Sequence, residues 1–203
     1  MSDAPPSLVL ATANPHKVTE IRAILAAAGV DIDLRPRPDE VPDVIEDADT
    51  LEGNARLKAV ALSDATGLAA LADDTGLEVD ALGGEPGVQS AYYGGGDHDA
   101  AANVARVLTE LADAPDAART ARFRTVALVR WPDGRELAAT GTVEGTITEA
   151  PAGDGGFGYD PIFRPDEAPE LTFAQMDPEA KDAISHRGRA MRALAEQLVG
   201  VRP

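Results

Sequence analysis

The chain has 203 residues, 44% of them hydrophobic, which is enough for one large domain or for two closely joined lobes with a sizeable core. Its 35 acidic and 18 basic residues give a formal charge of -17 at pH 7, and this charge repels DNA, RNA and anionic membranes. The absence of cysteine excludes disulfides, thiolate nucleophiles and cysteine zinc sites.

Local signals in the first third of the chain predict alternating strands and helices. A short apolar run precedes Asn14 and Pro15, which are typical of the cap and the first position of a helix. Gly29 suits the left-handed end of that helix, and Thr50 caps a second one. The predicted elements are a strand over 7–12, a helix over 15–29, a strand over 31–34, an exposed loop rich in Pro and acid over 35–49, and a helix over 50–66.

The rest of the chain predicts a buried strand, a helix, a hairpin and a C-terminal helix. The strand over 68–72 delivers Asp73 and Asp74 at its C-terminal end, where open α/β sheets usually hold ligands. Pro132-Asp133-Gly134 is typical of a hairpin turn between two β-rich runs. The further elements are a helix over 100–112, hairpin strands over 123–131 and 137–147, a glycine cluster over 153–158, and a helix from about residue 185 or 187 to 198.

The ends of the chain and its apolar runs bear on location. The N-terminal residues lack the basic and apolar regions of a signal peptide, and no apolar run approaches the roughly 18 residues of a membrane span. We therefore expect a cytoplasmic protein without membrane contact. It is predicted to be a single domain over residues 1–203, in which residues 1–6 form a flexible extension.

Residues 12–17 read Thr-Ala-Asn-Pro-His-Lys and form the first candidate site, a strand-to-helix turn. The exposed N–H groups of a helix start, together with polar side chains and Lys17, can hold a phosphate group. Lysine occurs only at positions 17, 58 and 181, so its presence in this turn is informative. The alternative is an ordinary Asn-Pro cap beside a lysine in solvent. The spacing excludes a Walker loop.

The second candidate site is Asp73-Asp74-Thr75-Gly76, which places two carboxylates side by side, with Glu46 and Glu52 upstream. Carboxylate oxygens suit Mg²⁺, which typically takes one or two of them together with substrate phosphates. A carboxylate near the metal can orient or deprotonate an attacking water. The alternative is an Asp-rich turn or helix cap in a chain that is rich in Asp.

Two further segments can bind a base or a phosphate. The glycine cluster at 153–158 formally matches the dinucleotide-binding pattern, but Pro161 disfavours the helix that this pattern requires. A ligand loop in which Phe157 stacks on a base fits better, and a plain turn with Phe157 in the core is the alternative. Residues 181–187 gather a lysine, a hydroxyl, an imidazole and a guanidinium, although a solvated helix start has the same composition.

Five segments in this order resemble the Ham1/RdgB-like family, also called the inosine or xanthosine triphosphate pyrophosphatases. The resemblance runs from Leu8 to about Leu198. The segments are Leu-Ala-Thr-Ala-Asn-Pro-His-Lys at 10–17, Thr-Leu-Glu-Gly-Asn-Ala-Arg-Leu-Lys-Ala at 50–59, Ala-Asp-Asp-Thr-Gly-Leu at 72–77, Gly-Gly-Phe-Gly-Tyr-Asp-Pro-Ile-Phe at 155–163 and Ala-Ile-Ser-His-Arg-Gly at 183–188. Each is modest alone, but the five together are highly specific.

The resemblance implies an α/β fold with a mixed, strongly twisted central sheet flanked by helices, and two lobes around a nucleotide cleft, usually in a homodimer. It implies that Asp74 is the proton acceptor and a ligand of Mg²⁺, with Glu46 as a further metal ligand and Asp73 in a supporting role. Phe157 is expected to stack on the purine. The substrate-binding residues that the resemblance implies are Thr12, Ala13, Asn14, Pro15, His16, Lys17, Thr75, Phe157, Gly158, Tyr159, Asp160, Lys181, His186 and Arg187.

The implied activity is Mg²⁺-dependent hydrolysis of dITP, ITP, XTP or dXTP to the monophosphate and pyrophosphate, which removes deaminated purines from the nucleotide pool. A hydrogen-bonding pocket suits this discrimination, because a buried polar group left unpaired by the wrong base is costly. A Maf-like pyrophosphatase and a nucleotide-binding regulator without catalysis are the two other hypotheses. The segments at 155–163 and 183–188 point away from the first, and the retained Asp74, Lys17 and Lys181 argue against the second.

Overall fold

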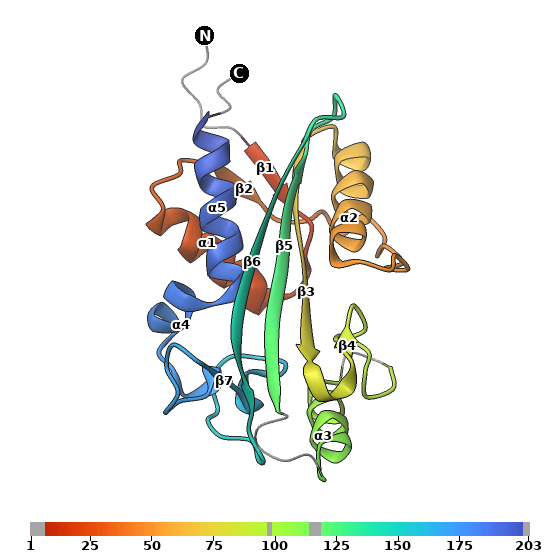
Figure 1. Ribbon diagram of the computed structural model, residues 1–203. Helices are drawn as coiled ribbons and strands as arrows, with labels where there is room; N and C mark the ends of the chain where they lie inside the picture. The colour runs from red at the N-terminus through yellow and green to blue at the C-terminus, as the bar shows by residue number, and fades with distance from the viewer. Residues whose placement is uncertain (1–6, 97–98, 114–118, 201–203) are drawn as a thin grey trace. The chain divides into compact units, whose positions relative to one another are not determined.

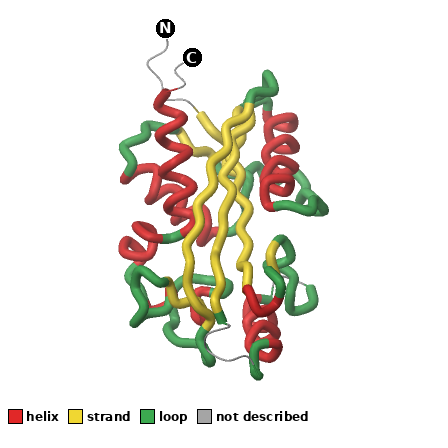
Figure 2. Tube along the Cα trace, viewed as in Figure 1, coloured by secondary structure: helices red, strands yellow, loops and turns green. Residues whose placement is uncertain are grey.

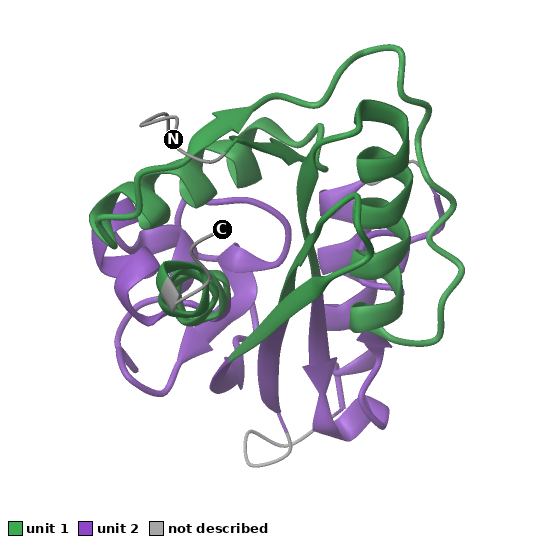
Figure 3. Ribbon diagram, turned by 90° about the horizontal axis from the view of Figure 1, so that it is seen from above, with its two compact units in different colours: residues 1–74, 125–141, 187–203 green, residues 75–124, 142–186 purple. Residues whose placement is uncertain are grey.

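The computed structural model describes residues 7–96, 99–113 and 119–200, in which the chain forms two compact units. Unit 1 combines residues 1–74, 125–141 and 187–203, and unit 2 combines residues 75–124 and 142–186 (Figure 3). Among the helices of the described part, none is long and apolar enough to cross a membrane. The flexible extension predicted at residues 1–6 lies outside the described residues.

The described strands form one mixed sheet. They are β1 Ser7–Leu10, β2 Asp33–Arg35, β3 Ala69–Val79, β4 Pro86–Gly87, β5 Thr120–Arg130, β6 Glu136–Ile147 and β7 Phe163–Pro165. Their order is β2-β1-β3-β5-β6-β7, with β4 paired to β3. β1 runs parallel to β2 and β3, whereas the β3–β4 and β6–β7 pairs are antiparallel. The strands β3, β5 and β6 are the long yellow strands in Figure 2, and each contributes residues to both units (Figure 3). The predicted α/β class with a mixed sheet is confirmed.

Helices cover both sides of the strands of unit 1. They are α1 Pro15–Ala27, α2 Leu51–Thr66 and α5 His186–Gly200. α1 and α5 lie on one side of the strands and α2 lies on the other (Figures 1 and 3). Ile21 of α1 and Met191 of α5 share one core cluster with Leu8, Leu71 and Val129 from the strands. Burial of these side chains stabilises unit 1 by about 1.5–3 kcal/mol for each large aliphatic group.

Capping side chains fix the starts of the first two helices. Asn14 Oδ1 accepts hydrogen bonds from two backbone N–H groups in the first turn of α1. Thr50 Oγ1 accepts a hydrogen bond of 3.0 Å from the N–H of Gly53 in α2. Each cap satisfies N–H groups that have no partner within the helix. At its other end α2 stops at Gly67, whose φ of 66° is left-handed. The predicted helix starts at Asn14 and Thr50 are therefore confirmed.

Unit 2 has a core that is richer in aromatic side chains. Its helices are α3 Ala100–Glu110 and α4 Pro178–Ile184, together with the short 3-10 turns η1 Asp80–Leu82, η3 Asp160–Ile162 and η4 Phe173–Gln175. The ring of Phe163 lies 4.7 Å from that of Phe123 and 5.1 Å from that of Phe173, measured between centroids. Leu77 and Val79 of β3 belong to the same cluster.

The course of β3 corrects one prediction. The sequence predicts a strand over 68–72 with Asp73 and Asp74 at its C-terminal end, whereas β3 continues to Val79 and holds both residues in its middle. Leu77 and Val79 extend the strand because both are fully buried in the core of unit 2. The low strand preference of aspartate is outweighed here by these contacts and by the ion pairs of the two carboxylates.

The other differences concern short elements. β4, β7 and α4 were not predicted, because with two, three and seven residues they are too short to show a period. The hairpin between β5 and β6 is confirmed, and its turn is closed by a 3.0 Å hydrogen bond from the N–H of Trp131 to the carbonyl of Arg135. The C-terminal helix begins at His186, as expected, and continues to Gly200.

Candidate active site

Asp73 and Asp74 lie directly beyond the end of a parallel neighbour. The pairing of β1 with β3 ends at Leu10 and Leu71, after which the N–H of Ala11 donates a 2.7 Å hydrogen bond to the carbonyl of Leu71. β1 then leads into α1, while β3 continues. The carboxyl end of β1 therefore borders the two aspartates, and it is at the carboxyl ends of parallel strands that open α/β sheets usually bind ligands.

Asp73 is a buried carboxylate between two cations of unit 1. Its Oδ2 atom lies 3.2 Å from Lys17 Nζ and 3.2 Å from Arg187 Nε. Arg187 is held in turn by Glu20, with 2.5 Å between Nη1 and Oε2. Burial alone would raise the pKa of Asp73, but the charges of Lys17 and Arg187 outweigh it and lower that pKa well below its usual range. Asp73 is thus fixed in its ionised form.

Asp74 has a different environment. Its Oδ1 accepts a hydrogen bond of 2.7 Å from Lys58 Nζ, and the same ammonium lies 3.0 Å from Glu46 Oε2. Burial raises the pKa of Asp74 to about 6, although Lys58 opposes the shift. Burial would lower the pKa of Lys58, but attraction to Asp74 and Glu46 raises it. A carboxyl group with a pKa near 6 is suited to accept a proton close to neutral pH.

Lys58 is the functional candidate that the sequence reasoning missed. It lies on α2, and its side chain is 12% exposed. Two signals pointed to it: it is one of only three lysines, and it belongs to the segment at 50–59 that carries the family resemblance. Its pairing with Asp74 is not visible in the sequence, because nothing local connects a helix to a strand sixteen residues later.

The turn at 12–17 caps α1 and also places Lys17 beside Asp73. Thr12 Oγ1 accepts a 3.2 Å hydrogen bond from the N–H of Asn14, whose own side chain caps α1. Ala13, Pro15 and His16 are exposed or partly exposed. Lys17 is bound to Asp73 rather than surrounded by solvent, so the alternative of a solvent lysine is wrong. The predicted role of this turn in binding phosphate stays a prediction.

In unit 2 the glycine cluster is built around Asp160. Asp160 Oδ2 accepts hydrogen bonds of 2.7 Å from the N–H of Phe157 and of 2.7 Å from Lys181 Nζ. A Cβ atom on Gly156, whose φ is 67°, would lie 2.1 Å from the same carboxylate oxygen. Lys181 Nζ also lies 5.1 Å from the centre of the Phe157 ring. Phe157, Asp160 and Lys181 are therefore brought together as predicted.

The glycine cluster is neither a dinucleotide-binding loop nor core. After it the chain makes only the short turn η3 and then enters β7, so the phosphate-binding helix of the dinucleotide pattern is missing from these described residues. Phe157 is only partly buried and is not among the described side chains of the core clusters. The interpretation of this segment as a ligand loop stays a prediction.

The neighbouring residues of the predicted pocket are held mainly by protein contacts. The hydroxyl of Tyr159 donates a 2.8 Å hydrogen bond to the carbonyl of Ser90. The ring of His186 stacks on Phe123, with 4.5 Å between centroids. Arg187, the next residue in the sequence, belongs to unit 1 and pairs with Asp73 and Glu20. The binding roles predicted for these side chains, and for Thr75 and Gly158, stay predictions.

The carboxylates of unit 1 fit a divalent cation. Asp74 and Glu46 already converge on one cation, the ammonium of Lys58. Asp73 Oδ1 is buried and has no hydrogen-bond partner among the described residues, so an acceptor is available beside them. Hard oxygen donors of this kind are the ligands that Mg²⁺ prefers. In the described part of the chain, however, no three acidic or histidine side chains are arranged ready to hold a metal.

Comparison with known proteins identifies the family. A sequence model of the Ham1 family matches residues 8–197. The chain belongs to the Ham1 family. A Ham1 protein from Coxiella burnetii has a solved structure with a TM-score of 0.86 and 38% identity, covering 97% of this chain and 100% of that one.

Two further relatives of this Ham1 chain have names that state an activity. A protein from Streptomyces coelicolor named dITP/XTP pyrophosphatase is 50% identical over 189 residues, which are 92% of this chain and 94% of that protein. A crystal structure of a nucleoside-triphosphatase or dITP/XTP pyrophosphatase from Mycobacterium abscessus is 43% identical, with a TM-score of 0.75, and covers 97% of this chain and 100% of that one.

Proposed function

We propose that the protein hydrolyses dITP, ITP and XTP or dXTP between the α- and β-phosphates, giving the nucleoside monophosphate and pyrophosphate. Two observations support this proposal. Relatives that are about half identical over most of the chain are named dITP/XTP pyrophosphatases. The observation that carries it in this chain is Asp74, a buried carboxyl group with a raised pKa beside two cations and a second carboxylate. In the cell, this hydrolysis removes deaminated purines from the nucleotide pool.

Asp74 acts as the proton acceptor in this proposal. A water molecule attacks the phosphoanhydride, its proton passes to Asp74, and the bond between the α- and β-phosphates breaks so that pyrophosphate leaves. The pKa of about 6 keeps most Asp74 side chains ionised at pH 7 and still basic enough to accept a proton. Lys17 and the N–H groups at the start of α1 supply positive charge for the phosphates.

Asp74, Glu46 and Asp73 are the residues that would hold Mg²⁺. When bound, the metal offsets phosphate charge and stabilises the leaving group. Dialysis against a chelator should abolish hydrolysis, and added Mg²⁺ should restore it. Full activity in the metal-free protein would contradict the proposed requirement for Mg²⁺.

The purine is assigned to the Phe157, Asp160 and Lys181 group of unit 2. An aromatic ring offers stacking on the base, worth about 1–3 kcal/mol by analogy with other base-binding proteins. Asp160 and Lys181 offer one acceptor and one donor within the same group. Such paired polar groups discriminate bases well, because a wrong base leaves one of them unpaired.

One assay separates this function from its alternatives. The protein is incubated with Mg²⁺ and dITP, XTP, dATP, dGTP or dTTP, and pyrophosphate is measured separately from phosphate. We expect pyrophosphate from dITP and XTP at far higher rates than from the other three. Phosphate as the main product, or equal rates on all five, contradicts the proposal, and equal rates favour a Maf-like activity. The homodimer that the family resemblance implies is tested by light scattering during gel filtration.

A further inference from the structure

Lys58 occupies a position that two proposed metal ligands share. Its ammonium lies 2.7 Å from Asp74 Oδ1 and 3.0 Å from Glu46 Oε2. The side chains of Lys58 and Asp74 are 12% and 10% exposed, so solvent screens this pair only weakly. Glu46 comes from the loop between β2 and α2, which the ammonium thereby connects to β3.

A divalent metal and this ammonium are competitors. Mg²⁺ binds carboxylate oxygens at about 2.0–2.1 Å, which is closer than an ammonium donates its hydrogen bonds. Both cations would draw on the same two carboxylate groups, and they repel each other at short distances.

We propose that the ammonium of Lys58 takes the place of the divalent metal between Asp74 and Glu46 in the metal-free protein, and that metal binding displaces it from both carboxylates. The inference rests on the proposed function and deepens it. Without the metal, the ammonium offsets repulsion between Asp73, Asp74 and Glu46. Once displaced, it is free to meet an anionic substrate.

The displacement has a thermodynamic consequence. Lys58 weakens metal binding to the free enzyme, because its contacts with Asp74 and Glu46 must be lost first. A nucleotide that attracts the displaced ammonium compensates for that loss. Metal and nucleotide should therefore strengthen each other's binding by the same factor, as linkage requires, and removing Lys58 should reduce this coupling.

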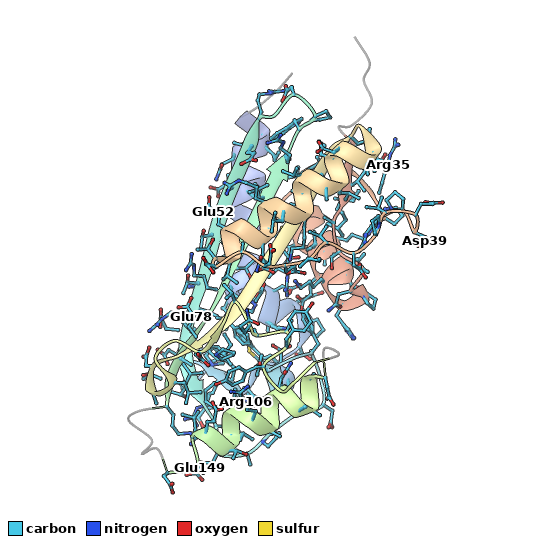
Figure 4. All side chains as sticks on the ribbon, turned by 90° about the vertical axis from the view of Figure 1, so that its right-hand side faces the viewer. Arg35, Asp39, Glu52, Glu78, Arg106 and Glu149 are labelled. Atoms are coloured by element: carbon cyan, nitrogen blue, oxygen red, sulfur yellow. The ribbon has the colours of Figure 1, made fainter. Side chains whose placement is uncertain are left out.

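Metal affinity without substrate gives the first test. Mn²⁺ binding to the free protein is measured by electron paramagnetic resonance for the unchanged protein, Lys58→Met and Arg56→Met. Methionine keeps the packed stem of the lysine and removes its charge. Arg56 is the matched control because it also lies on α2 but pairs with Glu52, seen at the first turn of that helix in Figure 4, and with Glu136.

We expect Lys58→Met to bind Mn²⁺ about tenfold or more tightly, because a full charge close to the ligands is lost. Arg56→Met should change the affinity by less than about threefold, since exposed charges are well screened. Equal or weaker binding by Lys58→Met, or an equal gain in both variants, overturns the inference.

A second test observes the lysine directly in the unchanged protein. With only three lysines in the chain, ¹³C-labelled lysine gives three side-chain signals, which through-bond experiments assign. Saturation with Mg²⁺ should shift the signal of Lys58 strongly and leave that of Lys181, which is bonded to Asp160, in place. A Lys58 signal that stays unchanged at saturation contradicts displacement, and this result decides the matter if Lys58→Met fails to fold.

These measurements separate the inference from the proposed function. If dITP is hydrolysed but Lys58 neither moves nor affects Mn²⁺ affinity, the function stands and the inference fails. If Mg²⁺ displaces Lys58 and Lys58→Met binds Mn²⁺ more tightly, but pyrophosphate is not released from any nucleotide, the function fails and the inference stands.

Discussion

Two adjacent carboxyl groups on β3 have opposite pKa shifts. Both are buried, but Asp73 is bound by Lys17 and Arg187, and its pKa is lowered. Burial raises the pKa of Asp74 to about 6. Lys58 opposes this shift only in part, and its ammonium also pairs with Glu46. Environments that separate two neighbouring carboxyl groups in this way are typical of acid–base sites. The structure therefore favours Asp74, and not Asp73, as the proton acceptor.

The first prediction concerns turnover. Asp74→Asn should lower kcat for dITP by several orders of magnitude and largely preserve nucleotide binding, because the amide keeps the shape but cannot accept the proton. Pyrophosphate release and calorimetric binding of a non-hydrolysable dITP analogue measure the two effects. A variant that turns over normally would refute the role of Asp74.

The same substitution should have a pH-dependent effect on stability. The folded-state pKa of Asp74, about 6, exceeds its unfolded value of about 3.9, so native protein is destabilised as pH rises between these values. Asp74→Asn should therefore raise the free energy of unfolding by about 1–2 kcal/mol at pH 8, and this gain should vanish below about pH 4. Urea titrations in chelator measure it. Asp39→Asn, in an exposed loop position (Figure 4), serves as the control and should show no such gain.

Lys17 is predicted to act on binding. Lys17→Ala should raise KM for dITP at least tenfold, since a cation for the phosphates is lost, while Arg187 continues to hold Asp73. Initial rates over a range of dITP concentrations measure this. Lys17→Arg, which keeps the charge, should recover part of the loss, and an unchanged KM in Lys17→Ala would count against the assignment.

At the scale of elements, the site depends on where strands and helices stop. β1 ends before β3 does, so the first turn of α1 and the two aspartates share one edge of the sheet in unit 1. In unit 2 the chain between β6 and η3 folds back on the side chain of Asp160, which accepts a hydrogen bond from the N–H of Phe157. Close packing explains the glycine content of this segment, because Gly153 and Gly155 pass against the backbone of Ala174.

The glycine cluster gives a prediction with a matched control. In Gly156→Ala a Cβ would meet the Asp160 carboxylate, whereas Gly158 has a similar φ of 62° and open space around it. Gly158→Ala should therefore cost only the left-handed strain, about 1–2 kcal/mol. Gly156→Ala should cost clearly more and also raise KM for dITP, because Phe157 and Lys181 lose their partner. Urea unfolding compares the stability of the two variants, and initial rates measure KM for Gly156→Ala. Equal losses of stability would contradict this account of the segment.

At the scale of the whole molecule, the charge of -17 is the dominant feature. Self-repulsion of this size opposes the compact state, and salt screens it. Raising NaCl from about 10 mM to about 150 mM shortens the Debye length from about 30 Å to about 8 Å. Tm should therefore rise over this range, as measured by calorimetry with chelator present. A constant or falling Tm would show that the ion pairs, which salt weakens, outweigh the repulsion.

The sequence by itself determined the features that depend on neighbouring residues. Asn14 and Thr50 set helix starts because capping acts over two or three residues. Pro132-Asp133-Gly134 set the hairpin for the same reason. Five segments in a fixed order were enough to indicate the family, since residue type and spacing need no coordinates.

Only the tertiary structure decided which charges meet. Arg187 and Asp73 are 114 residues apart, and Arg187 and Glu20 are 167 residues apart, so no local rule could pair them. The same holds for Lys58, which reaches Asp74 from a helix on the other side of a turn. Burial by residues distant in sequence lets β3 continue through Asp73 and Asp74. The pKa values of these two residues shift in opposite directions, because desolvation and charge act through space and not along the chain.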